Sequence, residues 1–452
     1  MSRSVVVVGG GLAGITAALV CADAGAEVVL AERRSRLGGL TWSFQRRGLW
    51  LDNGQHVFLR CCTAYRALLE RLSVVDLVHL QDRLEIPVLA PGGTRARLRR
   101  SHLPAPLHLA PSLLGYGPLP VRERLALGRA ALALRGLDPA DPALDATTFG
   151  AWLADHGQSE RAVDVLWDLI TVPTVNLHAR DASLALAAKV FRTGLLDHAD
   201  AGDVGWSKVP LGRLHGDAAG RALDRAGVEV WTGARVARVS AAGGGFEVVA
   251  DGRTLTADAV IVATPPEVAA DLVPDGVLGP VGELGASPIV NVHLVFDRRV
   301  TDLPMAAAVD SPIQFVFDRS ESSGLTGPGQ CLAVSLSAAD AYVGWGAHAL
   351  QAYVAAALGE LFPVVQQAEV VDAAVTREPR ATFRGVPGTR RLRPPSQTSL
   401  PGLLVAGAWT ATGWPATMEG AVRSGAAAAR HALGGPSRPD LEPVTAVRGG
   451  TP

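Results

Sequence analysis

Three glycines near the start of the chain have the spacing that binds the pyrophosphate of a dinucleotide. Residues 9–14 read GGGLAG and fit G-x-G-x-x-G at Gly9, Gly11 and Gly14. In such a loop the first glycine permits a turn, the second lets the pyrophosphate approach the backbone, and the third lets the following helix pack on the preceding strand. The positive end of that helix attracts phosphates. Glu32, eighteen residues after Gly14, can accept hydrogen bonds from ribose hydroxyls.

A second group of residues that could take part in chemistry is the polar segment, which we define as residues 52–56. It reads DNGQH and stands between the apolar triplets LWL and VFL. Asn-Gly suits a tight turn, because both residues tolerate positive φ. A turn does not explain why Gln55 and His56 directly precede residues that should enter a core. The polar segment is therefore either an exposed hairpin turn with an incidental histidine or a set of polar groups that line a cavity.

The elements around these residues indicate an α/β fold. A β-branched run at residues 5–8 suits a buried parallel strand, a helical pattern follows over 15–24, and 27–31 is a second strand. Further helices are expected at 63–72, 121–134, 149–156, 160–171 (ended by Pro173), 348–361 and 420–432. Further strands are expected at 227–239, 245–250, 257–263, 288–297, 331–337 and 403–406.

Strands of the buried parallel type occur at both ends and in the middle of the chain. We therefore predict one nucleotide-binding domain that is built from three segments, residues 1–85, 205–265 and 385–434. Residues 86–204 and 266–384 would form an inserted α+β substrate domain with an antiparallel sheet and helices. Residues 435–452, rich in proline and glycine, are expected to be a disordered tail.

The composition is that of a globular protein with no preference for nucleic acid. Hydrophobic residues make up 48%, charged residues 19%, and the net charge is -1. The four cysteines include no C-x-x-C pair, so we expect no metal site of the zinc-thiolate type and a reducing compartment such as the cytoplasm. No apolar run of about 18 residues predicts a membrane span. Contact with the inner face of a membrane stays open.

The chain after the ribose-binding glutamate resembles the superfamily of flavin-containing amine oxidases and phytoene desaturases. Its signature, E-x-R-x-x-x-G-G, is matched by Glu32, Arg34, Gly38 and Gly39. Residues 233–236 (GARV) are similar to the segment that places a valine against the adenine. Residues 402–425 (GLLVAGAWTATGWPATMEGAVRSG) are similar to the closing motif of the family. The resemblance implies a Rossmann-like FAD-binding domain of the GR2-type with an inserted substrate domain.

The resemblance also implies which residues bind FAD. They come from the glycine motifs, the polar segment, the valine and the last helix, whose start would point at the flavin O2 region. They are Gly9, Gly11, Leu12, Ala13, Gly14, Glu32, Arg33, Arg34, Gly38, Gly39, Leu40, Gly54, Gln55, Val236, Gly407, Met418, Glu419, Gly420 and Ala421. In the superfamily the polar segment runs under the isoalloxazine ring, which favours the cavity interpretation. One departure is Ala408, where the family usually has an acidic residue that contacts the ribityl–phosphate region.

Longer stretches are similar to the squalene-associated FAD-dependent desaturases, the hydroxysqualene dehydroxylases of bacterial hopanoid biosynthesis. The stretches are residues 52–72, 166–196 and 203–219. This resemblance implies a long isoprenoid lipid as substrate and reductive removal of the hydroxyl from hydroxysqualene, which gives squalene and water. An acid would protonate the allylic hydroxyl, and hydride from reduced flavin N5 would quench the cation. The electron donor is not implied.

Three residues are candidate catalytic groups for this reaction. His56 has the best position by analogy, and an ordinary pKa near 6.5 suits proton donation. Asp168 lies in an apolar helix, where burial would raise its pKa and keep it protonated, unless it forms an ion pair. Asp52 is the third. For His215, in RLHGD, a loop or capping role is the stronger expectation.

A water-insoluble substrate would be delivered from a bilayer. Residues 86–135, rich in Leu, Pro and Arg, would then form a membrane-facing entrance, or else an ordinary helical lobe. Other functions remain open: an FAD-dependent desaturase of a carotenoid-type polyene, an amine oxidase, and a non-catalytic protein that binds FAD or prenyl lipid. An amine oxidase often has a lysine near flavin N5. The sequence places neither Lys189 nor Lys208 there, although Lys208 in GWSKVP stays open as a candidate.

Overall fold

The computed structural model describes residues 2–93 and 95–435, and its nucleotide half is built on a five-stranded parallel sheet. The strand order is β10 (Glu229–Thr232), β2 (Glu27–Glu32), β1 (Ser4–Val8), β14 (Ala259–Val262) and β20 (Leu403–Val405). The five strands fall inside the three segments expected for the nucleotide-binding domain. The domain limits themselves stay a prediction, and almost all of the expected tail lies outside the described residues.

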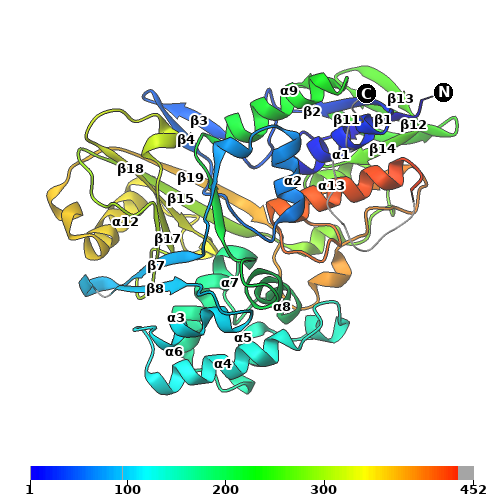
Figure 1. Cartoon of the computed structure of the whole chain (residues 1–452). Coiled ribbons are helices and arrows are strands. Elements are labelled where there is room, and N and C mark those ends of the chain that lie inside the picture. The colour runs from blue at the N-terminus through cyan, green and yellow to red at the C-terminus, as the bar shows by residue number, and fades with distance from the viewer. Residues whose placement is uncertain (1, 94, 436–452) are drawn as a thin grey trace, which may run out of the picture.

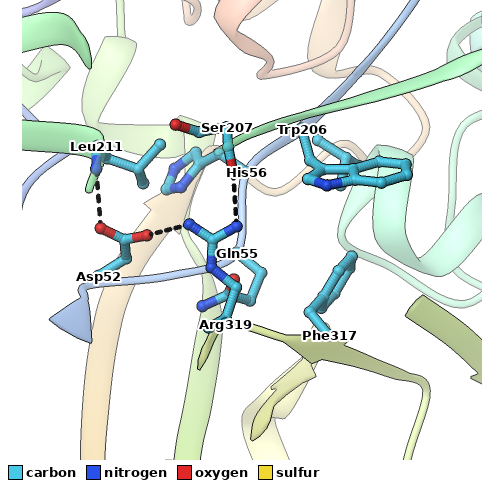
Figure 2. A pocket seen from close by; sticks show the side chains of 9 residues that line it. Asp52, Gln55, His56, Trp206, Ser207, Leu211, Phe317 and Arg319 are labelled. Carbon is cyan, nitrogen blue, oxygen red and sulfur yellow. Dashed lines mark hydrogen bonds and ion pairs between the residues drawn. The ribbon is translucent and has the colours of Figure 1, made fainter. Parts of the chain in front are cut away.

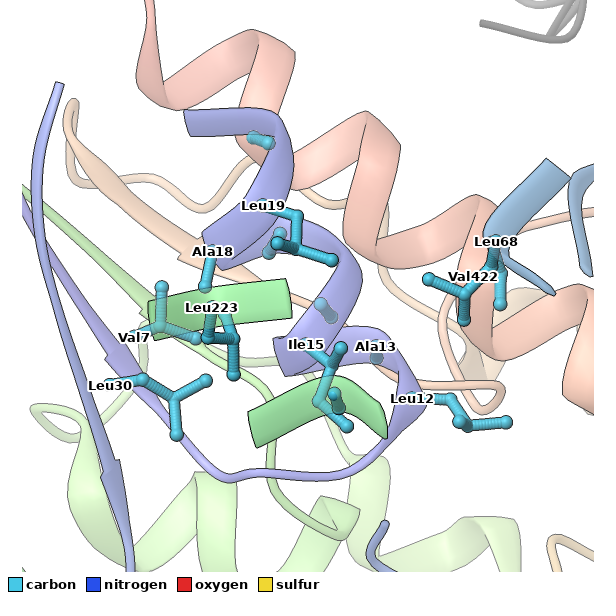
Figure 3. Packing of buried hydrophobic residues seen from close by; sticks show 14 of the residues in the cluster. Val7, Leu12, Ala13, Ile15, Ala18, Leu19, Leu30, Leu68, Leu223 and Val422 are labelled. Carbon is cyan, nitrogen blue, oxygen red and sulfur yellow. The ribbon is translucent and has the colours of Figure 1, made fainter. Parts of the chain in front are cut away.

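Helices from both ends and from the middle of the chain form the layer on one face of this sheet. The helices are α1 (Leu12–Asp23), α2 (Thr63–Arg71), α9 (Ala218–Arg225) and α13 (Met418–Ala432). In Figure 1, α13 (orange-red) lies beside α1 (blue). The two helices touch closely, because a Cβ on Gly425 would lie 2.1 Å from the carbonyl oxygen of Ala13. Figure 3 shows the core around α1, where Ile15 and Leu19 pack against Val7 and Leu30 of the sheet.

The strand predicted over residues 227–239 is in fact two strands. The first part is β10 of the parallel sheet, and the second is β11 (Val236–Ala242), which starts an antiparallel meander with β12 (Gly245–Ala250) and β13 (Arg253–Ala257). The break falls at Gly233, which has a φ of +74°. A positive φ is incompatible with an extended strand.

The substrate half contains a seven-stranded, mostly antiparallel sheet. Its order is β19 (Val370–Thr382), β15 (Ser287–Phe296), β18 (Gln330–Leu336), β17 (Phe315–Asp318), β16 (Met305–Ala308), β7 (Glu85–Leu89) and β8 (Arg95–Arg99). The helix α12 (Ala347–Leu361) packs on β15 and β19, and the short helices α10 (Pro266–Leu272) and α11 (Ser320–Ser323) lie in the connections.

A helical lobe stands below this sheet in Figure 1, coloured cyan to green. It contains α3 (Ala110–Leu114), α4 (Val121–Arg135), α5 (Phe149–Asp155), α6 (Glu160–Ala162), α7 (Asp168–Val175) and α8 (Leu184–Phe191). The prediction that Pro173 ends a helix was wrong. Pro173 lies inside α7, which ends at Asn176, a residue in the left-handed conformation. A π-helical turn, Val163–Trp167, joins α6 to α7, and another, Arg192–Leu196, follows α8.

Of the two interpretations of the polar segment, the hairpin turn at Asn53-Gly54 was wrong. The tight turn lies earlier, at Arg47 and Gly48, which have φ of +47° and +81° and join β3 (Ser43–Arg46) to β4 (Leu49–Asp52). Asn53 and Gly54 have no positive φ. The chain continues from β4 into β5 (Val57–Leu59), which forms a small sheet with β9 (Val204–Ser207) and β6 (Val78–Leu80). Among the described helices, none is long and apolar enough to cross a membrane.

Candidate active site

The two glycine motifs lie against each other. The N–H of Gly38 donates to the carbonyl of Gly10 at 2.8 Å. A Cβ on Gly39 would come within 2.8 Å of the Cα of Gly11. The space between the motifs therefore admits backbone only, and the four glycines form a cradle without side chains.

The start of α1 is free to receive phosphate oxygens. Gly11 is its N-cap residue, and no side chain caps the helix, so the N–H groups at Leu12 and Ala13 are left for a ligand. Gly14 packs α1 on the preceding turn so tightly that a Cβ there would lie 1.8 Å from the carbonyl oxygen of Gly9.

Glu32 connects the backbone segments on the ribose side of the cradle through hydrogen bonds. Its carboxylate accepts hydrogen bonds from the N–H groups of Gly10 at 2.7 Å and Arg34 at 2.8 Å. Residues 233–234 donate backbone hydrogen bonds to the carbonyls of Arg34 and Glu32, at 2.8 and 2.9 Å, and Val236 follows, buried. Each carboxylate oxygen keeps a second lone pair, so Glu32 can still accept from a ribose hydroxyl.

The start of α13 is fixed by caps. Thr417 accepts a hydrogen bond from the N–H of Gly420 at 3.1 Å. The Glu419 side chain is buried and accepts from the N–H groups of residues 64–65 at the start of α2 and from Arg423 at 2.6 Å. Glu419 therefore joins two helices, and only its backbone is left to face a cofactor.

The polar segment is deeply anchored rather than exposed. Asn53 is 2% exposed, and its amide group donates to the carbonyl of Leu40 at 2.7 Å and to Glu378 at 3.0 Å. Its Oδ1 accepts from the N–H of Trp42, and its carbonyl accepts from the hydroxyl of Thr376 at 2.7 Å. Asn53 thus links the nucleotide half to the antiparallel sheet.

A buried ion pair follows next to Asn53 (Figure 2). The Oδ1 of Asp52 accepts from the hydroxyl of Ser43 at 2.6 Å and from the N–H of Leu211 at 2.9 Å. Its Oδ2 accepts from Arg319 at 3.0 Å, and Arg319 also donates to the carbonyl of Ser207 at 2.8 Å. Since Asp52 is the counterion of Arg319, its carboxylate is not a free acid.

Asp52, Arg319, Gln55 and His56 line a small polar pocket. His56 Nδ1 lies 3.2 Å from the carbonyl oxygen of Gly54. Burial lowers the pKa of His56 below its ordinary value, so the imidazole is neutral at neutral pH. If Nδ1 donates to Gly54, Nε2 remains as an acceptor. The Nε2 of Gln55 is buried, and no described residue accepts its hydrogen bond.

A much larger apolar cavity adjoins the polar pocket and shares Gln55, Val57 and Phe317 with it. Its empty volume is about 1970 Å³ including the open mouth. It runs from Met418 at the start of α13 to Leu113 of α3 in the helical lobe, and about half of the residues that line it are leucine, isoleucine, valine and phenylalanine. Such a cavity suits a long hydrocarbon chain.

The structure does not bring Asp168 to this site. Its carboxylate accepts hydrogen bonds from His178 Nδ1 and from the N–H of Ala179, both at 2.7 Å, and the side chain does not line either cavity. The loop role expected for His215 was wrong, because His215 is fully buried in a helical turn and its Nε2 lies 2.8 Å from the Tyr65 hydroxyl. Burial lowers the pKa of His215 to about 3.

Two residues that sequence reasoning missed complete the site. Arg319 has no local signal, because its partner Asp52 lies 267 residues away. Lys189 stands in the apolar helix LALAAKVF and lines the large cavity, with Nζ 4.9 Å from the ring centre of Trp414. A lone cation in an otherwise apolar helix is a signal that could have found it.

Residues 12–433 match the family model of the flavin containing amine oxidoreductases. The chain belongs to this family. It is accordingly an FAD-dependent oxidoreductase with the mixed α/β fold of these enzymes.

The relatives of this flavin containing amine oxidoreductase have names that specify different substrates. It is 28% identical to a hydroxysqualene dehydroxylase of Rhodopseudomonas palustris, over 95% of this chain and 98% of that protein. It is 24% identical to a 15-cis-phytoene desaturase of Glycine max, over 93% of this chain and 78% of that protein. The solved structure of a putrescine oxidase bound to putrescine has a TM-score of 0.71 at 20% identity and covers 96% of this chain and 99% of that one, which shows the shared fold.

The residues of this flavin containing amine oxidoreductase fit FAD on structural grounds. The side-chain-free cradle and the uncapped start of α1 are both places where a ligand is needed. Gly407, with φ of +146°, donates its N–H to Ser424, which keeps the loop before α13 tight. The carbonyl of Ala408 accepts from Arg393, whose guanidinium holds that loop in place of an acidic side chain. The predicted contacts of the exposed residues Arg33, Arg34 and Leu40 stay predictions.

Proposed function

We propose that this protein removes the hydroxyl group of hydroxysqualene reductively and releases squalene and water. The cradle of the two glycine motifs, Glu32 and the start of α13 would hold FAD. Reduced FAD supplies hydride, and the chain supplies a dry cavity, hydrogen-bond donors and a proton. The resemblance over nearly the whole length of a hydroxysqualene dehydroxylase supports this proposal.

The observation that carries the proposal is an apolar cavity with polar donors at its cofactor end. Leucine-rich walls suit an isoprenoid chain, whereas the unpartnered amide of Gln55 and the cation of Lys189 suit an oxygen atom. A carotenoid-type polyene is a pure hydrocarbon and has no use for these donors. The Gln55 amide nitrogen is buried without a partner, which is costly, so it favours a substrate that bears a hydroxyl.

The same proposal includes contact with a membrane surface. The helical lobe exposes a set of large apolar side chains that we call the apolar patch, with exposed fractions from 45% to 65%. They are Leu103, Leu107, Leu114, Val121, Leu125 and Leu132. On the inner side of the same lobe, Leu113 and Leu127 line the cavity. Exposed arginines at 122 and 129 suit anionic lipid head groups, so substrate can enter the cavity from a bilayer.

An anaerobic incubation tests the reaction. The holoenzyme is reduced chemically and mixed with hydroxysqualene in detergent, flavin absorbance is followed, and the lipid is extracted for mass spectrometry. We expect squalene to form with reoxidation of the flavin in a one-to-one ratio. A parallel sample with phytoene and oxidised enzyme tests the desaturase. Unchanged hydroxysqualene beside reducible FAD refutes the dehydroxylase, and a desaturated phytoene in that case makes the polyene desaturase the better proposal.

A further inference from the structure

Lys189 is a cation inside an apolar cavity. It stands on α8, is more than half buried, and lines the cavity together with Trp414 and Met418 at the start of α13. Its Nζ lies 4.9 Å from the centre of the Trp414 ring. In the described part of the chain, no carboxylate or carbonyl forms a hydrogen bond or ion pair with it.

An ammonium group in such a place needs a partner. Burying an unpaired charge is unfavourable, and an aromatic face offsets only part of the cost. The other charged side chain that lines the cavity, Glu419, is already used by α2 and Arg423. The N–H bonds of Lys189 are therefore directed at whatever the cavity holds.

We propose that Lys189 donates the proton that converts the substrate hydroxyl into leaving water. This inference rests on the proposed function. The proton moves from Nζ to the hydroxyl oxygen, the carbon–oxygen bond breaks, and its electron pair leaves with the water. Bound reduced FAD would supply the hydride, two electrons and a proton, that neutralises the allylic cation. Lys189 is left as a neutral amine.

The other candidate acids are less suited to this step. Asp52 is the counterion of Arg319, and Asp168 is bound to His178 outside the cavity. His56 lines the polar pocket, but burial lowers its pKa from 6.5, which leaves it neutral at neutral pH. Its catalytic role stays a prediction that the experiments below compare with that of Lys189.

The charges around Lys189 keep it a usable acid. Burial lowers its pKa from 10.5, and so does Arg423 on α13. Arg192 on the neighbouring π-helical turn also lowers it, while Cys61 after β5 and Asp197 raise it. Burial and Arg423 therefore make Lys189 a stronger acid than an exposed lysine.

The pH dependence of flavin reoxidation separates the two donors. The donor must be protonated, so the rate is lost as the pH rises through its pKa. With Lys189 we expect a constant rate between about pH 6.5 and 8 and a fall above that range. With His56 the rate would already be falling below pH 6.5 and would be lost by pH 8. That result would overturn the proposal.

Three variants separate charge from proton donation. Lys189→Met should lower the rate of reoxidation by hydroxysqualene about 10²–10⁴-fold. Lys189→Arg keeps the charge over Trp414 but donates poorly, so it should be nearly as slow. Lys208→Met alters the one other lysine of the chain, which is exposed, and should react at the wild-type rate. FAD content and melting temperature show that each variant is folded.

Lysine carbon resonances give a second measurement that does not depend on turnover. Protein labelled with carbon-13 lysine has two lysine signals, which Lys208→Met assigns. In the oxidised holoenzyme, hydroxysqualene should shift the Lys189 signal and squalene should not. Equal spectra with both lipids, or a wild-type rate in Lys189→Met, would overturn the role of Lys189 but not the proposed function. A wild-type enzyme that leaves hydroxysqualene unchanged would overturn the proposed function as well.

Discussion

The ion pair of Asp52 and Arg319 holds the polar segment against the antiparallel sheet. Arg319 reaches from the end of β17 to Asp52 at the end of β4 and donates to Ser207 on β9, so one side chain joins three segments of the chain. Gln55 and His56 follow directly and line the pocket. Their position therefore depends on a contact that does not itself take part in chemistry.

Arg319→Ala should destabilise the protein strongly. Removal of one partner leaves the carboxylate of Asp52 buried without compensation, which costs about 3–5 kcal/mol. Chemical denaturation followed by circular dichroism measures the change. The control is Arg180→Ala, which removes an ion pair in which Arg180 is 77% exposed and should cost less than about 1 kcal/mol. Equal losses in both variants would contradict the structural role given to Arg319.

Gly14→Ala should abolish most FAD binding. A Cβ at this position would lie 1.8 Å from the carbonyl oxygen of Gly9, so α1 must move away from the cradle, at a cost of about 1–3 kcal/mol or more. The flavin absorbance of purified protein measures the loss. Gly220→Ala is the matched control, because nothing lies within 4 Å of its added Cβ, and alanine should stabilise α9 by about 0.5–1 kcal/mol. A Gly14→Ala protein with full FAD content would refute the tight packing.

Local patterns predict some of these residues and not others. Gly9, Gly14 and Glu32 could be found because strand, glycines and helix follow each other within a short stretch. Asp52 was recognised as polar in an apolar context, but its partner Arg319 lies far away along the chain. Asp168 looked like a buried acid, since the sequence does not show that the chain turns back and presents His178 to it.

At the scale of elements, α4 has two apolar faces. Leu127 and Leu134 are buried in the lobe, while Val121, Leu125 and Leu132 form a stripe on the solvent side. A helix that is apolar on its outer face is unusual on a water-exposed surface. This stripe is the centre of the apolar patch.

Replacement of the stripe should release the protein from lipid without unfolding it. In a variant with Val121→Ser, Leu125→Gln and Leu132→Gln, we expect at least a several-fold loss of binding to vesicles that contain anionic lipid, measured by co-sedimentation. The melting temperature should change little, since these side chains are exposed. The same changes should leave the reaction with detergent-solubilised substrate intact. Undiminished vesicle binding would show that this patch is not the membrane contact.

The sequence was less informative about helix interiors than about helix positions. The π-helical turns before α7 and after α8 insert an extra residue into the helical repeat, so a regular period cannot reveal them. Pro173 was expected to end a helix. The helix runs on past it and stops only at the αL residue Asn176, which a rule based on proline alone does not anticipate.

At the scale of the molecule, FAD binding depends on both ends of the chain. The glycine cradle comes from the first segment, and β20 and α13 from the last. Short buried strands that recur at both ends and in the middle of the chain predicted that a second domain interrupts the first. The pairing of β7 and β8 with the antiparallel sheet and the course of the cavity between the halves depend on long-range packing, which no local pattern contains.

A chain that ends at residue 400 should therefore lack FAD, although residues 9–14 and Glu32 are intact. Without α13, one side of α1 loses its cover and the cradle loses the helix start opposite it. Flavin absorbance per mole of purified protein measures this. A separately expressed fragment of residues 401–435 should restore part of the FAD content. A truncated protein that binds FAD at the wild-type level would contradict this dependence.

The close contact between Gly425 and Ala13 also has a consequence for synthesis. The ribosome makes the cradle among the first residues and the helix that covers it among the last, so α1 waits for its partner while the whole inserted half is translated. During that time the apolar side of α1 must be sheltered by the nascent chain itself or by a chaperone. We therefore expect the cofactor to be captured only after α13 has been made.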